Sequence, residues 1–320
     1  MDALSDILKS VSLAGAVFLD AEFHAPWCVR TRFGLDRARA KLPADAHVAL
    51  FHLLTEGRCK VRLDDGADLF ELVAGDLVLF AHDDRHLIGS DLDRLPLDAP
   101  AMAEPDADGP TCTTLRLGGP GEATRFVCGY VAFDRVLSRG LLQGLPRMLR
   151  VDIAATPAAA LVRELLRAGV HESASDRPGA ASSLTKLSEL LLVEAVRAHV
   201  ESQADTRAGW LAGLRDRHVG KALALLHGDP SRAWTVDELA RDVALSRSAL
   251  AERFTDLVGE SPMQYLLRWR LSRAARTLLG GDPISQVAAR SGYESEAAFS
   301  RAFKREFGLP PAAWRKRAAA

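Results

Sequence analysis

The feature that most constrains the fold of this chain is a sequence pattern that occurs twice near the C-terminus. Residues 239–254 and 287–303 can be superimposed: each has an apolar–Ala pair, a turn residue four positions after that Ala, and then a Ser that can cap a helix. From Ser246 and Ser295, an apolar residue follows at +4 and a Phe at +8, which places both on the face toward the preceding helix. Each copy is predicted to be a helix-turn-helix, whose second helix can enter the major groove of DNA.

The outward face of each second helix holds the candidate base contacts, at positions +1, +2, +5 and +6 from the cap. Arginine can donate to guanine or phosphate, glutamate can accept from cytosine, and serine can do either. Mixed charges also occur on ordinary solvated faces, but the basic residues that follow Arg301 favour DNA. The candidate DNA contacts are Arg247, Ser248, Ala251, Glu252, Glu296, Ala297, Ser300, Arg301, Lys304 and Arg305.

One helix is predicted between the two copies. Residues 261–279 start with a Ser cap and Pro262 and are followed by Gly280, an order of residues that begins and ends a helix. About eighteen residues at 1.5 Å each give roughly 27 Å. With the width of the two units, this helix would hold the second helices about one DNA turn, 34 Å, apart. Arg273 and its basic neighbours would contact the intervening phosphates without reading sequence.

The charge distribution also separates this region from the rest of the chain. Residues 210–320 carry 18 Lys and Arg against 12 Asp and Glu, so the total charge of −1 divides into +6 for this segment and −7 for residues 1–209. A basic segment attached to an acidic body is typical of a chain that meets a polyanion at one end, although two ordinary domains can also differ in charge by chance.

The N-terminal body is predicted to be a small antiparallel β-barrel or jelly roll. Short apolar and β-branched runs at close spacing are separated by turn signals such as Glu56-Gly57 and Asp65-Gly66. After residue 155 the pattern becomes helical, and the apolar stripes there either pack on the barrel or form a homodimer interface. The expected fold is a multidomain α+β chain. It has a barrel domain at residues 1–150, a helical linker and possible dimerisation region at 151–209, and a helical domain with two helix-turn-helix units at 210–320.

Residues 210–317 resemble the DNA-binding domain of the AraC/XylS family of bacterial transcription regulators. The closing stretch at 288–311, from Gly292-Tyr-Glu-Ser through Phe299-Ser-Arg-Ala-Phe to Gly308-Leu-Pro-Pro, is similar to the signature of that family. The resemblance implies a sequence-specific regulator that binds operator half-sites on double-stranded DNA as a homodimer. RNA polymerase is a further expected partner if the protein is an activator.

The N-terminal body resembles the cupin sensor domain of a subset of these regulators, which includes reactive-chlorine-responsive members. Residues 75–86 match the second cupin motif, Gly-x5-Pro-x-Gly-x2-His, with Ala81 and Asp83 in place of Pro and Gly. Residues 52–56 form a partial first motif, in which Leu50 replaces a second His. The resemblance implies that His52, His86 and Cys128 meet inside the barrel.

Several signals fit such a site. Two imidazoles and one thiolate suit zinc or copper, whereas direct oxidation would act on Cys112 or Cys128. An organic ligand in the barrel, a barrel that serves only for dimerisation, and inert buried His and Cys side chains are the other interpretations. The competing class of function is a metal-dependent cupin enzyme fused to a DNA-binding domain. The missing first-motif His argues against it, and we expect no enzymatic activity.

The location of the protein is also an expectation. No apolar run approaches the roughly 18–20 residues that span a bilayer. The N-terminus lacks the pattern of a secretory signal, and four cysteines in 320 residues are no disulfide scaffold. We therefore expect a cytoplasmic protein without membrane partners.

Overall fold

The computed structural model divides the chain into two compact units, which are described separately. The barrel unit comprises residues 12–134 and 145–203, and the helical unit comprises residues 1–11, 135–144 and 204–320. None of the helices described has the length and apolar composition needed to cross a bilayer. Within these units the structure describes residues 3–5, 14–31, 46–98, 113–134, 138–153, 157–173, 178–202 and 209–318.

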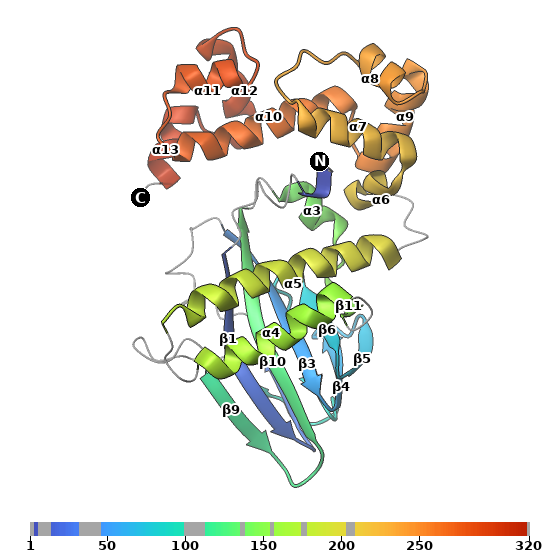
Figure 1. Cartoon of the computed structure of the whole chain (residues 1–320), viewed down its shortest axis with the longest axis vertical. Coiled ribbons are helices and arrows are strands. Elements are labelled where there is room, and N and C mark those ends of the chain that lie inside the picture. Colours follow the sequence, from blue (N-terminus) through green and yellow to red (C-terminus); the bar gives the residue numbers. More distant parts are fainter. Residues whose placement is uncertain are drawn as a thin grey trace. The chain divides into compact units, whose positions relative to one another are not determined.

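The barrel unit contains two sheets (Figure 1). The larger has the strand order β11-β6-β3-β10-β1-β9, and the smaller has the order β5-β4-β7-β2-β8. The strands are β1 (Ala14–His24), β2 (Cys28–Thr31), β3 (Ala46–Glu56), β4 (Arg58–Leu63), β5 (Leu69–Val73), β6 (Asp76–Phe80), β7 (His86–Gly89), β8 (Leu97–Asp98), β9 (Thr113–Gly118), β10 (Ala123–Asp134) and β11 (Met148–Asp152).

The central strands of the six-stranded sheet are packed on both faces. Its inner face packs apolar residues into the barrel, where Trp27 stacks on Phe23 at 4.5 Å and meets Phe126 edge-on at 5.6 Å. Its outer face is covered by α4 (Pro157–Ser173) and α5 (Ala180–Ser202), which pack on each other and on strands β1 and β10 (Figure 1). Packing of these helices on the barrel, one of the two predicted alternatives, is thus observed.

The helical unit contains the two predicted helix-turn-helix copies, joined by one long helix. Ser246, Ser261 and Ser295 each cap a helix, and each side chain accepts a hydrogen bond from a backbone N–H in the first turn. The α+β fold class is therefore confirmed. The helices are α3 (Arg139–Gly144), α6 (Trp210–Arg215), α7 (Arg217–Gly228), α8 (Val236–Asp242), α9 (Arg247–Val258), α10 (Pro262–Leu279), α11 (Ile284–Arg290), α12 (Glu296–Phe307) and α13 (Pro311–Ala318).

A glycine at the β3–β4 turn provides a stability test. Gly57 has φ +80°, and a Cβ there would collide with the carbonyl oxygen of Ala123, whereas Gly66 has φ +85° with open space around it. The left-handed backbone costs an alanine about 1–2 kcal/mol at either position. We expect Gly57→Ala to lower the free energy of unfolding clearly more than Gly66→Ala, as measured by urea denaturation followed by circular dichroism. Equal losses would contradict the close contact.

Candidate nucleic-acid interface and buried histidine–cysteine cluster

The second helix of the first helix-turn-helix copy, α9, is held in place by its core face. Leu250 and Phe254 are completely buried, and the turn before the helix passes through Ala244, whose φ of 58° is left-handed. The opposite face carries the predicted contacts: Ala251 is half-buried, and the others are exposed. Arg247 is not free for DNA alone, because its Nη1 lies 3.3 Å from Oδ2 of Asp237 at the start of α8. The exposed contacts on α9 are Arg247, Ser248 and Glu252.

The second helix of the second helix-turn-helix copy, α12, repeats this construction. Phe299 and Phe303 are completely buried, and Gly292, at the position equivalent to Ala244, is also left-handed with φ +77°. The extra residue in this turn, Tyr293, packs edge-on against Phe299 at 5.4 Å. Ser300 is half-buried, and the remaining predicted contacts are exposed. These are Glu296, Ala297, Arg301, Lys304 and Arg305.

Arg301 on α12 is exposed to solvent. Among the residues that the structure describes, it forms no hydrogen bond or ion pair, whereas Arg253 on α9 is bound to Asp216 through two nitrogens. A guanidinium that is not already paired loses no intramolecular partner when it meets a guanine edge. This makes Arg301 available in a way that Arg247 and Arg253 are not.

In the barrel unit, His52, His86 and Cys128 come together as a buried chain. His52 on β3 is the register partner of Cys128 on β10, and its Nδ1 lies 2.9 Å from the Cys128 sulfur. Its Nε2 lies 2.8 Å from Nε2 of His86, whose Nδ1 is 2.8 Å from the carbonyl oxygen of Asp84. Phe80 stacks on the His86 ring at 3.4 Å. The side chains of His52, His86 and Cys128 are each at most 5% exposed.

The hydrogen-bond pattern assigns the protons in this chain. Because a carbonyl only accepts, Nδ1 of His86 donates to Asp84, and its Nε2 must accept from Nε2–H of His52. His52 Nδ1 is then an acceptor, which receives the Cys128 thiol hydrogen. Burial lowers the pKa of His52 to about 4 and lowers the pKa of His86 well below its usual value, so both imidazoles are neutral at pH 7.

The same geometry does not fit one metal ion bound by all three residues. His52 faces Cys128 and His86 through opposite ring nitrogens, and one ion takes one nitrogen of a given imidazole. No group of three or more potential ligands is arranged for a metal in the part of the chain that the structure describes. Cys112 lies outside the described residues. Burial raises the pKa of Cys59 and of Cys28, so neither thiol is readily ionised.

Comparison with known proteins assigns both units. A family described as Cupin matches residues 2–201, and one described as Helix-turn-helix domain matches residues 239–317. The chain is 34% identical to an AraC-like transcription regulator of Streptomyces lividans, with 99% of this chain and 98% of that protein covered. It is 36% identical to another AraC-like transcription regulator, from Streptomyces antibioticus, with 84% of this chain and 87% of that protein covered. It is 26% identical to the RCS-specific HTH-type transcriptional activator RclR of Escherichia coli, with 99% of this chain and 98% of that protein covered.

The neutral imidazoles predict a pH dependence of stability. His52 protonates near pH 6.5 in the unfolded chain but only near pH 4 when folded, so between these values the unfolded chain binds more protons. The free energy of unfolding should therefore fall as the pH is lowered from 6.5 to 4, with about 3 kcal/mol from His52.

Urea denaturation of the wild type between pH 4 and 7 would measure this loss. His52→Gln should reduce the dependence by the share of His52, whereas His86, whose pKa is also lowered by burial, still contributes. His82→Gln removes an exposed histidine of the same unit and should leave the wild-type slope unchanged. A His52→Gln variant with the wild-type slope would contradict the assignment.

Proposed function

The chain belongs to the AraC-like transcription regulators that carry an N-terminal cupin domain, and we propose that it reads two half-sites of one operator with α9 and α12. The observation that carries this proposal is the repeated construction of the two helices, each of which buries its core face completely and exposes the opposite one. Arg301 would contact a base, and Arg273 would contact a phosphate between the half-sites.

The proposed assembly is a homodimer that works on chromosomal DNA in the cytoplasm and contacts RNA polymerase if it activates transcription. The helices that cover the barrel leave apolar side chains exposed, and these support a dimer contact: Leu161, Leu165 and Leu190 are 61%, 44% and 42% exposed. A second copy seated on them would remove this apolar area from water.

We propose that the signal is an oxidant that acts on Cys128. The relative RclR is named an RCS-specific activator, and in the present chain the Cys128 thiol hydrogen already points at the imidazole nitrogen of His52. Hypochlorous acid would convert the thiol to a sulfenic acid with release of HCl, and His52 would take the thiol proton as the sulfur attacks. A sulfenic acid has no S–H group and cannot repeat the original S–H···N contact. The hydrogen bonds among His52, His86 and Cys128 must therefore rearrange.

We propose no enzymatic turnover for the cupin unit. His52 uses both of its ring nitrogens and His86 uses both of its own within the chain. Leu50 occupies the position of the missing motif histidine and is buried in the apolar core of the barrel. This arrangement leaves no polar group of the cluster open toward a substrate.

Arg301→Ala tests the reading role, with a duplex selected from a random library by the wild-type protein. Loss of a base contact should cost about 1–3 kcal/mol of binding and relax the preference at one base pair. Arg273→Ala is the contrasting variant, because loss of a phosphate contact should weaken binding to all sequences and flatten the salt dependence. Equal losses by Arg301→Ala on the selected duplex and on random DNA would argue against base reading.

Thiol titration of unfolded protein, combined with metal analysis, tests the proposed signal. After one equivalent of hypochlorite, the wild type and Cys59→Ser should each lose one or two thiols, because a sulfenic acid at Cys128 can condense with a second thiol on unfolding, whereas Cys128→Ser should lose none. Cys59→Ser is the matched control because that thiol is buried without a histidine partner. Stoichiometric zinc or copper released on oxidation would support the metal interpretation, and loss of a thiol in Cys128→Ser would overturn the role of Cys128.

A further inference from the structure

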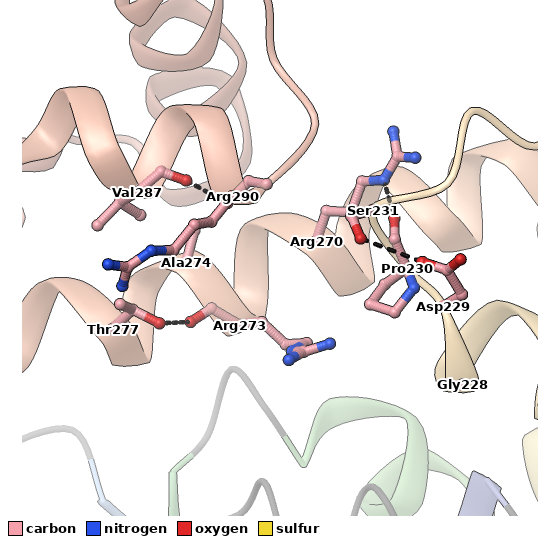
Figure 2. A pocket seen from close by; sticks show the side chains of 11 residues that line it. Gly228, Asp229, Pro230, Ser231, Arg270, Arg273, Ala274, Thr277, Val287 and Arg290 are labelled. Atoms are coloured by element: carbon pink, nitrogen blue, oxygen red, sulfur yellow. Dashed lines mark hydrogen bonds between the residues drawn. The ribbon is translucent and has the colours of Figure 1, made fainter.

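A pocket of about 460 Å³ lies between the two halves of the helical unit (Figure 2). One wall is the loop after α7, the floor is α10, and the other wall is the end of α11. The pocket therefore involves both helix-turn-helix copies, and it lies outside the surfaces of α9 and α12 assigned to base reading. Three arginines line it: Arg270, Arg273 and Arg290.

Arg270 joins the two halves. It lies on α10, and its Nε and one terminal nitrogen donate to the carbonyl oxygens of Pro230 and Arg232 in the first half. On the other side, a Cβ placed at Gly292 would lie 3.4 Å from the guanidinium carbon of Arg270 and 3.4 Å from the carbonyl oxygen of Ser231. The turn of the second copy thus rests directly on this guanidinium, so Arg270 is a positioning residue for the pocket.

Arg273 and Arg290 supply the unused donors. Arg273 follows Arg270 by three residues on α10, is exposed, and forms no side-chain hydrogen bond or ion pair within the described ranges. Arg290 forms an ion pair with Asp282 at 2.7 Å through one terminal nitrogen and lies 3.4 Å from Gln286 through the other, which leaves further N–H groups. The two arginines extend from different elements that border the same pocket (Figure 2).

The hydroxyl groups of the pocket already donate hydrogen bonds within the protein. The hydroxyls of Ser231, Thr277 and Ser291 donate to the Asp229 carboxylate and to the backbone oxygens of Arg273 and Val287, respectively. Asp229 also accepts from the backbone N–H of Arg232. Even when Asp229 and the paired Asp282 are counted against the three arginines, the pocket keeps a net positive charge. Its free donors are guanidinium groups, which match oxyanions.

We propose that this pocket binds a phosphate-ester oxyanion, held by Arg273 and Arg290. One source is a backbone phosphate of the DNA that crosses between the two reading helices, and this version rests on the proposed function. The other source is a free phosphorylated small molecule, which would bind without DNA. In either case the occupant bridges the central helix α10 and the end of α11.

Arginine modification of the full-length wild-type protein tests the site. Phenylglyoxal labelling, read by peptide mass spectrometry, would be compared in inorganic phosphate and in chloride at equal ionic strength. Phosphate should slow the labelling of Arg273 and Arg290 several-fold, and it should leave the exposed Arg276 of α10 and Arg217 of α7 unchanged. Equal labelling of Arg273 and Arg290 in phosphate and chloride overturns the proposal.

A second arm identifies the source of the phosphate. With a bound mixed-sequence duplex in place of inorganic phosphate, protection of Arg273 and Arg290 identifies a DNA phosphate as the occupant. Duplex binding without this protection, when phosphate does protect, supports the free phosphorylated ligand. A wild-type protein that binds no duplex contradicts the proposed function, whereas the phosphate arm still decides the pocket.

A thermal-unfolding measurement on variants gives an independent readout. Phosphate should raise the unfolding midpoint of the wild type and of Arg276→Gln by about 2–4 °C more than that of Arg273→Gln. The difference between variants removes the general stabilisation that phosphate salts give to folded proteins. An equal rise in all three proteins would overturn the role of Arg273.

Discussion

Helices α9 and α12 depend on one shared element, helix α10, which is buried along one side. Its first half packs into the first copy, where Tyr265 meets Phe254 edge-on at 5.8 Å. Its second half supplies Leu271, Ala274 and Leu278 to the core that holds Phe299 and Phe303. Because one rigid helix is part of both cores, neither copy can move along the helix axis without breaking its own packing. The separation of α9 and α12 is therefore a property of the core.

The barrel unit buries its central polar residues, whereas α9 and α12 expose their charged residues. On α9 and α12 the charged groups are exposed and several have few internal partners, so they can meet a polyanion. In the barrel, His52, His86 and Cys128 are buried and satisfy one another as a neutral chain that ends on a backbone carbonyl. A buried chain with no spare donor is sensitive to any chemical change at one member, because the loss of one hydrogen bond leaves a buried polar group without its partner.

Local signals made the helical unit predictable from the sequence. Serine caps, Pro262 and the +4 and +8 spacing act within one or two turns of helix, and all three predicted caps are formed. Strand β1 could also have been predicted from a local signal, because its residues from Leu19 to His24 alternate between apolar and polar side chains.

The sites were predictable only in part, for a related reason. The motif pointed to His86, and the family resemblance grouped it with His52 and Cys128. The use of opposite nitrogens of His52 follows from strand register and barrel closure, which no linear motif encodes. The ion pair of Arg247 with Asp237 and the pocket around Arg270 likewise depend on contacts between elements distant in the chain.

The proposal that α9 and α12 each contact one half-site is tested most directly by guanine methylation protection on a duplex selected by the wild-type protein. The account predicts two clusters of protected major-groove positions for each bound chain, with centres about 10 base pairs apart. A substitution on α12 should then remove protection from one cluster only. A single cluster for each chain, or two clusters at variable spacing, would contradict a separation fixed by α10.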